Sequence, residues 1–369
     1  MWRCRNCHRR YDWTRVHPTC PACGGPLDRE MPIVFHPEAE QPDAPGLWRY
    51  VPAMGLPMTD SPVTLGEGRT PLQPVHPAQG PRVFVKREDL NPTGSVKDRA
   101  ASVLFTWARE QGVKEVATLA TPNTLRSWRR YAARAHLRVR AYGVEGMSSG
   151  SPRGVPVRTL PGTWWETMTA LHREETAVLV PYHPLAVDAY TTIAYELVAQ
   201  LGRAPGTVLA PVGQGALLLG IGRGFLALLQ AGLISVMPVL VGVEPLARAG
   251  LWARAKGGRE AHLWVRDEAP GPTVEAGRRF PWWGDLLLEL VAWSRGRFLA
   301  VDDEAWMRAR DAFRRVGLYL QPESVLVWAG WAMHQEEWPE PVVLILPGGQ
   351  PSIWRRIGRW FRLRIFSKE

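Results

Sequence analysis

The sequence predicts an α/β fold of two domains built on parallel sheets, preceded by a small cysteine-rich ribbon. Strand-like and helix-like segments alternate from residue 83 to residue 346, which is typical of parallel sheets with helices on both faces. All four cysteines lie within the first 23 residues, in two Cys-x-x-Cys pairs. The length of 369 residues fits two domains at about 150 residues each.

The composition excludes a fibrous or largely disordered chain, since 46% of residues are hydrophobic and 22% are charged. No apolar run or small-residue cleavage site follows Met1, so we expect no signal peptide and a cytoplasmic location. The longest apolar stretch, Gly215 to Val243, contains Arg223, Pro238 and several glycines. We therefore predict a buried helix followed by a strand there, and not a membrane span.

The net charge of +10 favours polyanions without specificity. All but five of the 45 basic residues are arginines, and we interpret their clusters as solvated faces. We expect no specific nucleic-acid partner and no membrane partner.

The cysteine spacing predicts a structural zinc ribbon over residues 1–28. Cys4, Cys7, Cys20 and Cys23 form two short turns whose thiolates can converge on one tetrahedral ion. Two disulfides or a redox pair are the alternatives, and the absence of a secretion signal argues against disulfides. Such a zinc site is closed and does no catalysis.

The rest of the chain divides by composition and pattern. Residues 29–62 are rich in Pro, Glu and Asp and predict a linker and an arm packed on the main body. Residues 63–352 carry the α/β pattern, with a smaller domain at roughly 98–180. Residues 353–369 predict a basic amphipathic helix, which either docks on the main body, the interpretation we favour, or lies on an anionic membrane surface.

Individual elements follow from the alternating pattern. We expect strands at 83–85, 115–119, 137–142, 207–212, 239–243 and 342–346, and helices at 100–111, 124–136, 192–201, 216–230 and 303–316.

The first of three strand-to-helix loops delivers a lysine to the start of a helix. An Asn-Pro-Thr-Gly turn precedes Lys97. The positive potential at a helix N-terminus favours the neutral amine that attacks an aldehyde. Taken alone, a lysine in a turn is most often simply solvated.

The other two loops can hold anions. Thr121 fits an N-cap and Pro122 the first helical residue, which leaves Asn123 at the carboxyl edge of the sheet. The Gly213–Ala216 turn lets backbone amides cradle a phosphate at the start of a helix. Either loop alone is also an ordinary helix start, but three of them in one sheet point to a phosphate-bearing ligand.

Several segments together resemble the pyridoxal-phosphate enzymes of fold type II, the tryptophan synthase β family, and within it the threonine-synthase-like members that carry an N-terminal zinc ribbon. The resemblance spans nearly the whole chain, and the Asn-Pro-Thr-Gly-Ser-x-Lys-Asp-Arg stretch is its most specific part. It implies a two-domain fold with the cofactor in the cleft between the domains. The resembling segments are 66–72, 86–99, 131–135, 191–201, 211–225 and 321–324.

The resemblance also implies roles for individual residues. Lys97 would bind pyridoxal phosphate covalently and then act as the proton-transferring base, and Asn123 would hydrogen-bond the ring hydroxyl. The cofactor phosphate would be wrapped by Gly213, Gln214, Gly215, Ala216 and Leu217. The substrate would be contacted by Lys86, Ser95, Arg99, Thr121 and Thr124, with Lys86 on a substrate phosphate.

The implied reaction is a lyase reaction that converts O-phosphohomoserine and water to threonine and phosphate, in a homodimer with structural zinc. Three departures bear on it: Pro122 removes a backbone donor, Pro347 stands where the family places a Ser or Thr beside the ring nitrogen, and residues 142–158 form a short stretch. Ser352 is a candidate to compensate for Pro347. A serine/threonine dehydratase-type lyase, or a catalytically impaired homologue acting as a binding or regulatory protein, therefore stays open. Because the ribbon is distant in sequence, we expect its deletion to leave cofactor binding intact.

Overall fold

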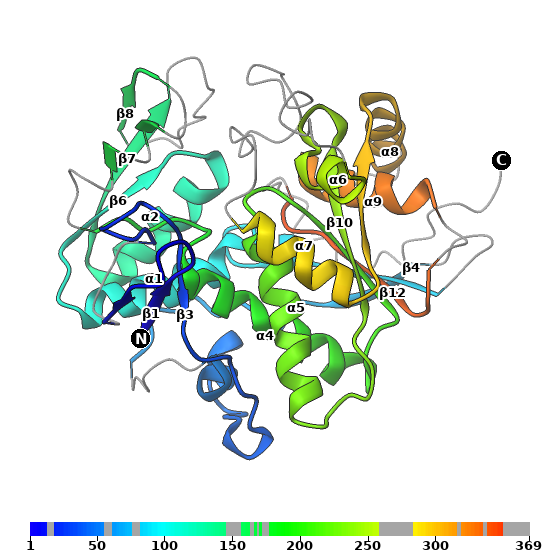
Figure 1. Ribbon diagram of the computed structural model, residues 1–369, viewed down its shortest axis with the longest axis horizontal. Helices are drawn as coiled ribbons and strands as arrows, with labels where there is room; N and C mark the ends of the chain where they lie inside the picture. Colours follow the sequence, from blue (N-terminus) through cyan, green and yellow to red (C-terminus); the bar gives the residue numbers. More distant parts are fainter. Residues whose placement is uncertain are drawn as a thin grey trace.

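The fold is described from a computed structural model (Figure 1). The described residues are 1–12, 18–54, 61–75, 82–144, 156–162, 166–167, 170–171, 177–257, 283–315, 319–334 and 338–349. The predicted helix at 353–369 lies outside them, as does Ser352.

A six-stranded sheet in the order β11-β10-β9-β12-β5-β4 forms the centre of the larger part of the molecule. Its first five strands are parallel, as predicted, and β4 pairs antiparallel with β5 at one edge. The strand bounds are β4 Leu72–Val75, β5 Val83–Lys86, β9 Thr207–Pro211, β10 Val239–Pro245, β11 Arg297–Val301 and β12 Val342–Ile345.

Helices cover both faces of this sheet. Side chains of successive strand residues point to opposite faces, so Val208 and Ala210 of β9 pack in one core while Leu209 packs in the other. The first core also contains the buried faces of α1, α4, α5 and α7, and the second those of α8 and α9. The helix bounds are α1 Lys97–Glu110, α2 Pro122–Ala135, α4 Pro184–Leu201, α5 Ala216–Gln230, α6 Gly250–Ala255, α7 Gly284–Trp293, α8 Asp303–Arg315 and α9 Pro322–Ala332.

A smaller parallel sheet lies to one side, at the left of Figure 1. Its strands β6 (Glu115–Leu119), β7 (Arg138–Val144) and β8 (Val157–Leu160) are in sequence order, and residue Val178 bridges to Ala117 at its edge. Helix α2 packs on this sheet through Trp128, whose indole N–H donates to the Leu179 carbonyl at 3.2 Å. This unit places the carboxyl end of β6 and the start of α2 opposite the larger sheet.

Most predicted elements are confirmed within one to three residues. Helix α5 and strand β6 match the predicted bounds, and the stretch Gly215 to Val243 forms α5 followed by β10. Helix α4 is the exception, since it begins at Pro184 and not at residue 192. Nearly all of its residues are buried, including the polar Asp188, Thr191 and Glu196. Polar residues therefore do not mark an exposed face of this helix, and the sequence shows little helical periodicity. Among the described helices, none combines the length and apolar character needed to cross a bilayer.

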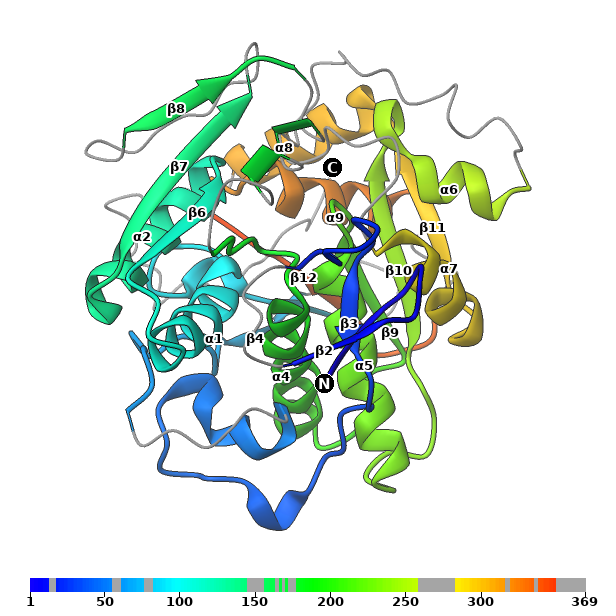
Figure 2. The same ribbon diagram turned by 60° about the vertical axis from the view of Figure 1, so that its left-hand side comes forward.

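The N-terminal ribbon is joined to the main body by a continuous core. Its strands β1 (Trp2–Cys4), β2 (Arg10–Tyr11) and β3 (Leu27–Arg29) are antiparallel, and they lie beside α4 (Figure 1 and Figure 2). Trp2 is 1% exposed, and its ring meets the His183 ring edge-on with the ring centroids 5.9 Å apart. The Arg223 guanidinium on α5 donates twice to the Asp28 carboxylate, at 2.7 and 2.9 Å.

The segment after the ribbon also packs on α4. Its 3₁₀ helices, Pro37–Ala39 and Gly46–Met54, lie in residues 29–62, and the second buries Leu47, Trp48 and Met54. Arg29 donates to the Asp188 carboxylate on α4 at 2.5 Å and to the Met54 carbonyl at 2.7 Å.

Candidate active site

A cavity opens where the carboxyl ends of β6, β9 and β12 face one another. Helices α1, α2, α5 and α9 all begin at it, so four positive helix ends converge on one space. The cavity has a volume of about 90 Å³, which is several times the space that one water molecule needs. Its polar lining is Ser95, Lys97, Thr121, Asn123, Thr124, Tyr182, Tyr190, Gln214, Gln321 and Glu323.

The turn before α1 places Lys97 on this lining. Gly94 has φ +90°, a conformation that suits glycine and turns the chain sharply toward the helix. The Val96 amide donates to the Pro347 carbonyl at 2.7 Å, and the Gly349 amide donates to the Gly94 carbonyl at 3.1 Å. These bonds tie the turn to the loop after β12, and Lys97 is the first residue of α1.

Asp98 stabilises the same turn through hydrogen bonds. Its buried carboxylate accepts hydrogen bonds from the Thr93 amide at 2.6 Å, the Thr93 hydroxyl at 2.5 Å and the Ser127 hydroxyl on α2 at 2.7 Å. Burial raises the pKa of Asp98 to about 6, and these three hydrogen bonds act in the opposite direction. The carboxyl group therefore joins the Lys97 turn to α2.

Arg99 forms the centre of a buried ion network. Its guanidinium donates to Glu88 at 2.7 and 2.8 Å and to Glu196 on α4 at 2.7 and 2.9 Å. Burial lowers the pKa of Arg99, but the two carboxylates outweigh it and raise that pKa well above its ordinary value. Arg99 and Glu88 are both 0% exposed, so this pairing takes place away from solvent.

Lys86 completes the network on its other side. Its ammonium group donates to the Glu196 carboxylate at 2.6 Å, the Thr70 carbonyl at 2.7 Å and the Gln200 side chain at 3.0 Å. Burial raises the pKa of Glu196, but Arg99 and Lys86 together bring it below its usual value. With two cations and two carboxylates, counting Glu88, the network is electrically balanced.

The structure does not bring Lys86 and Arg99 to the cavity, although the sequence predicts both as substrate contacts. Each side chain is 0% exposed, and each forms an ion pair with Glu196. The reason is physical: a buried cation needs a close carboxylate, and α4 supplies one in Glu196. Ser95, Thr121 and Thr124, the other predicted contacts, do line the cavity.

The loop after β6 has the expected cap. The Thr121 side chain accepts from the Thr124 amide at 3.4 Å, and Pro122 takes the first position of α2. Pro122 has no N–H, so one backbone donor is missing where the helix begins. Asn123 reaches into the cavity and exchanges two hydrogen bonds with Gln321.

The loop after β9 offers backbone amides. Residues Gly213 to Leu217 all line the cavity, and Gly215 caps α5 with φ +93°. The first amides of a helix have no carbonyl partner within the helix, so the start of α5 provides donors and a positive potential. A Cβ on Gly213 would meet no atom within 4 Å, which leaves open space beside the loop.

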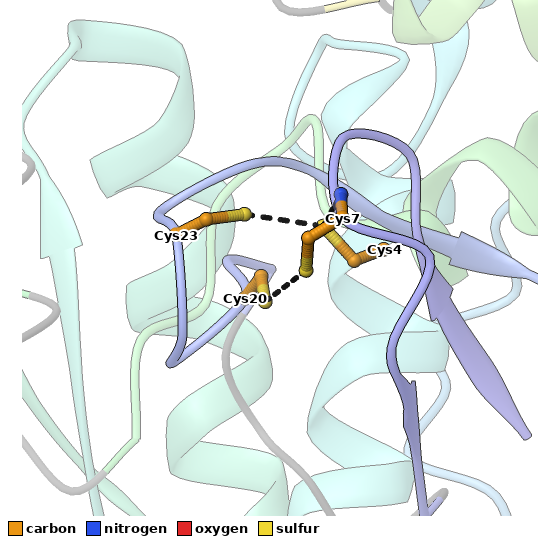
Figure 3. Close-up of side chains that lie close together, drawn as sticks. All are labelled: Cys4, Cys7, Cys20 and Cys23. Atoms are coloured by element: carbon orange, nitrogen blue, oxygen red, sulfur yellow. Dashed lines mark hydrogen bonds between the residues drawn. The ribbon is translucent and has the colours of Figure 1, made fainter.

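The four ribbon cysteines form a cluster (Figure 3), and none of them lines the cavity. Their sulfur atoms all lie within 4.8 Å of one another, with Cys4 to Cys23 at 3.5 Å and Cys7 to Cys20 at 3.6 Å. Four sulfurs placed tetrahedrally at 2.3 Å from an ion are separated by about 3.8 Å, so the cluster has the dimensions of a metal site.

The family model of the pyridoxal-phosphate dependent enzymes matches residues 63–348. The chain belongs to this family. The match includes Lys97, the loop at Asn123 and the loop at Gly213, so the three loops around the cavity all lie in the family region.

Named relatives agree with this family. The chain is 28% identical over 349 residues to the threonine synthase of Methanosarcina acetivorans, covering 89% of this chain and 85% of the relative. It is 28% identical over 359 residues to the threonine synthase of Methanocaldococcus jannaschii, covering 91% and 88%.

Solved structures of the same fold cover the body of the chain. A fungal L-serine ammonia-lyase from Rhizomucor miehei is 19% identical with a TM-score of 0.60, covering 76% of this chain and 93% of that one. A threonine deaminase from T.th. is 23% identical with a TM-score of 0.54, covering 77% and 92%. These likenesses show the fold.

The cavity fits the cofactor that the family uses. Pyridoxal phosphate needs an amine for its aldehyde, donors for its phosphate and a polar partner for its ring hydroxyl. The cavity lining offers these three groups, in the amine of Lys97, the backbone amides at the start of α5 and the side chain of Asn123. Pro347 also lines the cavity, and its side chain offers no hydrogen bond.

Sequence reasoning missed several lining residues. Tyr190 lies on the part of α4 that lacks a periodic signal, and Tyr182 just precedes that helix. Gln321 and Glu323 stand in a segment that resembles the family, but their side chains carry no role in that resemblance. Only the folded chain shows that both line the cavity and that Gln321 meets Asn123.

We predict that Glu196→Gln lowers the free energy of unfolding by about 3–5 kcal/mol, because it leaves Lys86 and Arg99 with too little buried negative charge. Urea denaturation measures this loss. The matched control is Glu304→Gln, whose carboxylate pairs with Arg308 at the exposed surface and is 77% exposed. That variant is expected to change the free energy by less than about 0.5 kcal/mol. Equal effects in the two variants would contradict the role given to the network.

Proposed function

We propose that this chain is a pyridoxal-phosphate-dependent lyase of the threonine synthase type, which converts O-phosphohomoserine and water to threonine and phosphate. The observation that carries the proposal is the meeting of Lys97, Asn123 and the Gly213–Leu217 loop in one cavity. The threonine synthases that match this chain cover it almost from end to end, which supports the reaction.

In this proposal each loop holds one part of the cofactor. Lys97 would bind the aldehyde carbon, Asn123 would donate to the ring hydroxyl oxygen, and the amides of the Gly213–Leu217 loop would hold the phosphate. When bound, the cofactor supplies an electron sink for negative charge at the α-carbon of the amino-acid substrate.

With cofactor and substrate bound, the Lys97 amine would be the group that accepts and returns protons at the substrate carbons. Ser95, Thr121 and Thr124 stand where they can bind the substrate carboxylate. Thr121 and Thr124 lie at the start of α2, where Pro122 lacks a backbone donor, whereas Ser95 lies in the turn before α1.

A second candidate is a dehydratase-type lyase acting on serine or threonine. It is favoured by the position of Lys86, which is bound to Glu196 and so is not available for a substrate phosphate. In the described part of the lining, Lys97 is the one cationic side chain and Glu323 is an acidic one. A hydroxyl leaving group needs no cation of this kind.

A catalytically impaired homologue that acts as a binding or regulatory protein is the third interpretation, and Pro122 and Pro347 are the observations behind it.

We predict that purified protein loaded with pyridoxal phosphate is yellow, and that borohydride followed by peptide mapping places a pyridoxyl group on Lys97. The protein should then release phosphate from O-phosphohomoserine with formation of threonine, and Lys97→Ala should abolish both the label and the turnover. Formation of 2-oxo acid from serine or threonine without phosphate release would support the second candidate instead. A labelled protein that turns over none of these substrates would support the impaired homologue. Label on Lys86 would contradict the site itself.

We further propose that the ribbon binds one structural Zn²⁺ through Cys4, Cys7, Cys20 and Cys23, and that the protein is a cytoplasmic homodimer. The compact sulfur cluster supports the metal. Elemental analysis and light scattering test the metal content and the dimer.

We predict that chelating this metal lowers the melting temperature of the main body as well as that of the ribbon. Trp2 and Leu27 belong to the same core as α4, so loosening the ribbon exposes apolar surface of the main body. Because the ribbon packs on α4 and α4 carries Tyr190 of the cavity lining, we further propose that loss of the ribbon weakens cofactor binding. This proposal replaces the expectation from the sequence that the ribbon can be deleted without such an effect. Calorimetry with and without chelator measures the effect, and re-addition of Zn²⁺ is the control. A main transition at the same temperature in both samples would contradict it.

A further inference from the structure

A pair of side-chain amides spans the cavity from the smaller unit to the larger one. The Asn123 amide nitrogen donates to the Gln321 side-chain oxygen at 2.6 Å, and the Gln321 amide nitrogen donates to the Asn123 side-chain oxygen at 2.7 Å. Asn123 belongs to the first turn of α2, whereas Gln321 is the N-cap of α9. The pair therefore depends on both units being in place.

The surroundings determine which way both amides face. The Gln321 amide nitrogen also donates to the Gly349 carbonyl at 3.2 Å, so a flipped Gln321 would set two oxygens against each other. Arg126 donates to the same Asn123 oxygen at 3.4 Å. Gln321 therefore fixes the orientation of the Asn123 side chain. The Asn123 amide oxygen accepts hydrogen bonds from Gln321 and Arg126, and its amide nitrogen faces Gln321.

The backbone holds Gln321 firmly in this position. Its own amide donates to the Gly348 carbonyl at 3.1 Å, and its side-chain amide occupies the space that a Cβ on Gly348 would need. A Cβ at position 348 would lie only 2.6 Å from Cδ of Gln321, so any residue other than glycine would push the side chain away.

One amide hydrogen of Asn123 remains for a ligand. A primary amide has two hydrogens, and among the described residues only Gln321 accepts one of them. Since Asn123 lines the cavity, the second hydrogen is available to an acceptor there. We propose that Gln321 is a positioning residue that orients Asn123 as a hydrogen-bond donor to the anionic ring oxygen of the bound cofactor.

This inference rests on the cofactor of the family and not on the proposed substrate. Its readouts need no substrate, so they stand whether or not the chain acts on O-phosphohomoserine.

The test compares cofactor-loaded wild-type protein with Gln321→Met, Asn123→Ala and the double variant. Visible absorption is followed against pH, and cofactor affinity is measured by titration. A donor to the ring oxygen favours its anionic form, so its loss raises the pH midpoint of the absorption change. We expect Gln321→Met to raise this midpoint and to weaken cofactor binding roughly tenfold. In the Asn123→Ala background the same substitution should change neither quantity further.

Two further variants keep the test decisive. Gln73→Met is the matched control, because Gln73 accepts a hydrogen bond from Arg87 outside the cavity lining and its loss should leave the midpoint unchanged. Gly348→Ala displaces Gln321 without altering it and should shift the midpoint in the same direction, even if Gln321→Met does not fold. A wild-type midpoint in Gly348→Ala or Gln321→Met would overturn the proposal. Additive effects of Gln321→Met and Asn123→Ala would also overturn it, because Gln321 would then act independently of Asn123.

Discussion

The rest of the active-site architecture depends on the buried pairing of Arg99 with Glu88 and Glu196. Charges that are fully removed from water are stable only with close partners, and the loss of one partner costs several kcal/mol. The pairing therefore restricts how α1, α4 and the segment after β5 can lie relative to one another. Lys97 is two residues before Arg99 on the same helix, so the constraint on Arg99 also constrains the position of Lys97.

This arrangement divides two superficially similar lysines between different tasks. Lys86 is buried and donates to Glu196, so it acts as part of the scaffold. Lys97 lies at the start of a helix on the cavity wall, where it can react. The same cavity receives the starts of α2, α5 and α9, and their combined positive potential suits an anionic cofactor. Pro122 has no backbone donor and the side chain of Pro347 offers no hydrogen bond, while Lys97 and the Gly213–Leu217 loop line the same cavity.

Much of the fold and part of the candidate site are predictable from sequence, because they rest on local signals. Helix α5, the cap at Thr121 and the turn before Lys97 each follow from neighbouring residues. The destination of Lys86 is not predictable in this way, since its partner Glu196 is 110 residues away and only the fold brings them together. The pairing of Asn123 with Gln321 spans 198 residues and escapes sequence reasoning for the same reason.

The central claim is that the buried charges hold Lys97, Asn123 and the start of α5 around one cofactor site. A crystal structure of the protein with pyridoxal phosphate bound tests it most directly. The account predicts continuous density from the Lys97 side chain to the cofactor ring, with the phosphate at the amides of Gly213–Leu217 and Lys86 still bound to Glu196. A cofactor joined to Lys86, or a phosphate located away from α5, would contradict it.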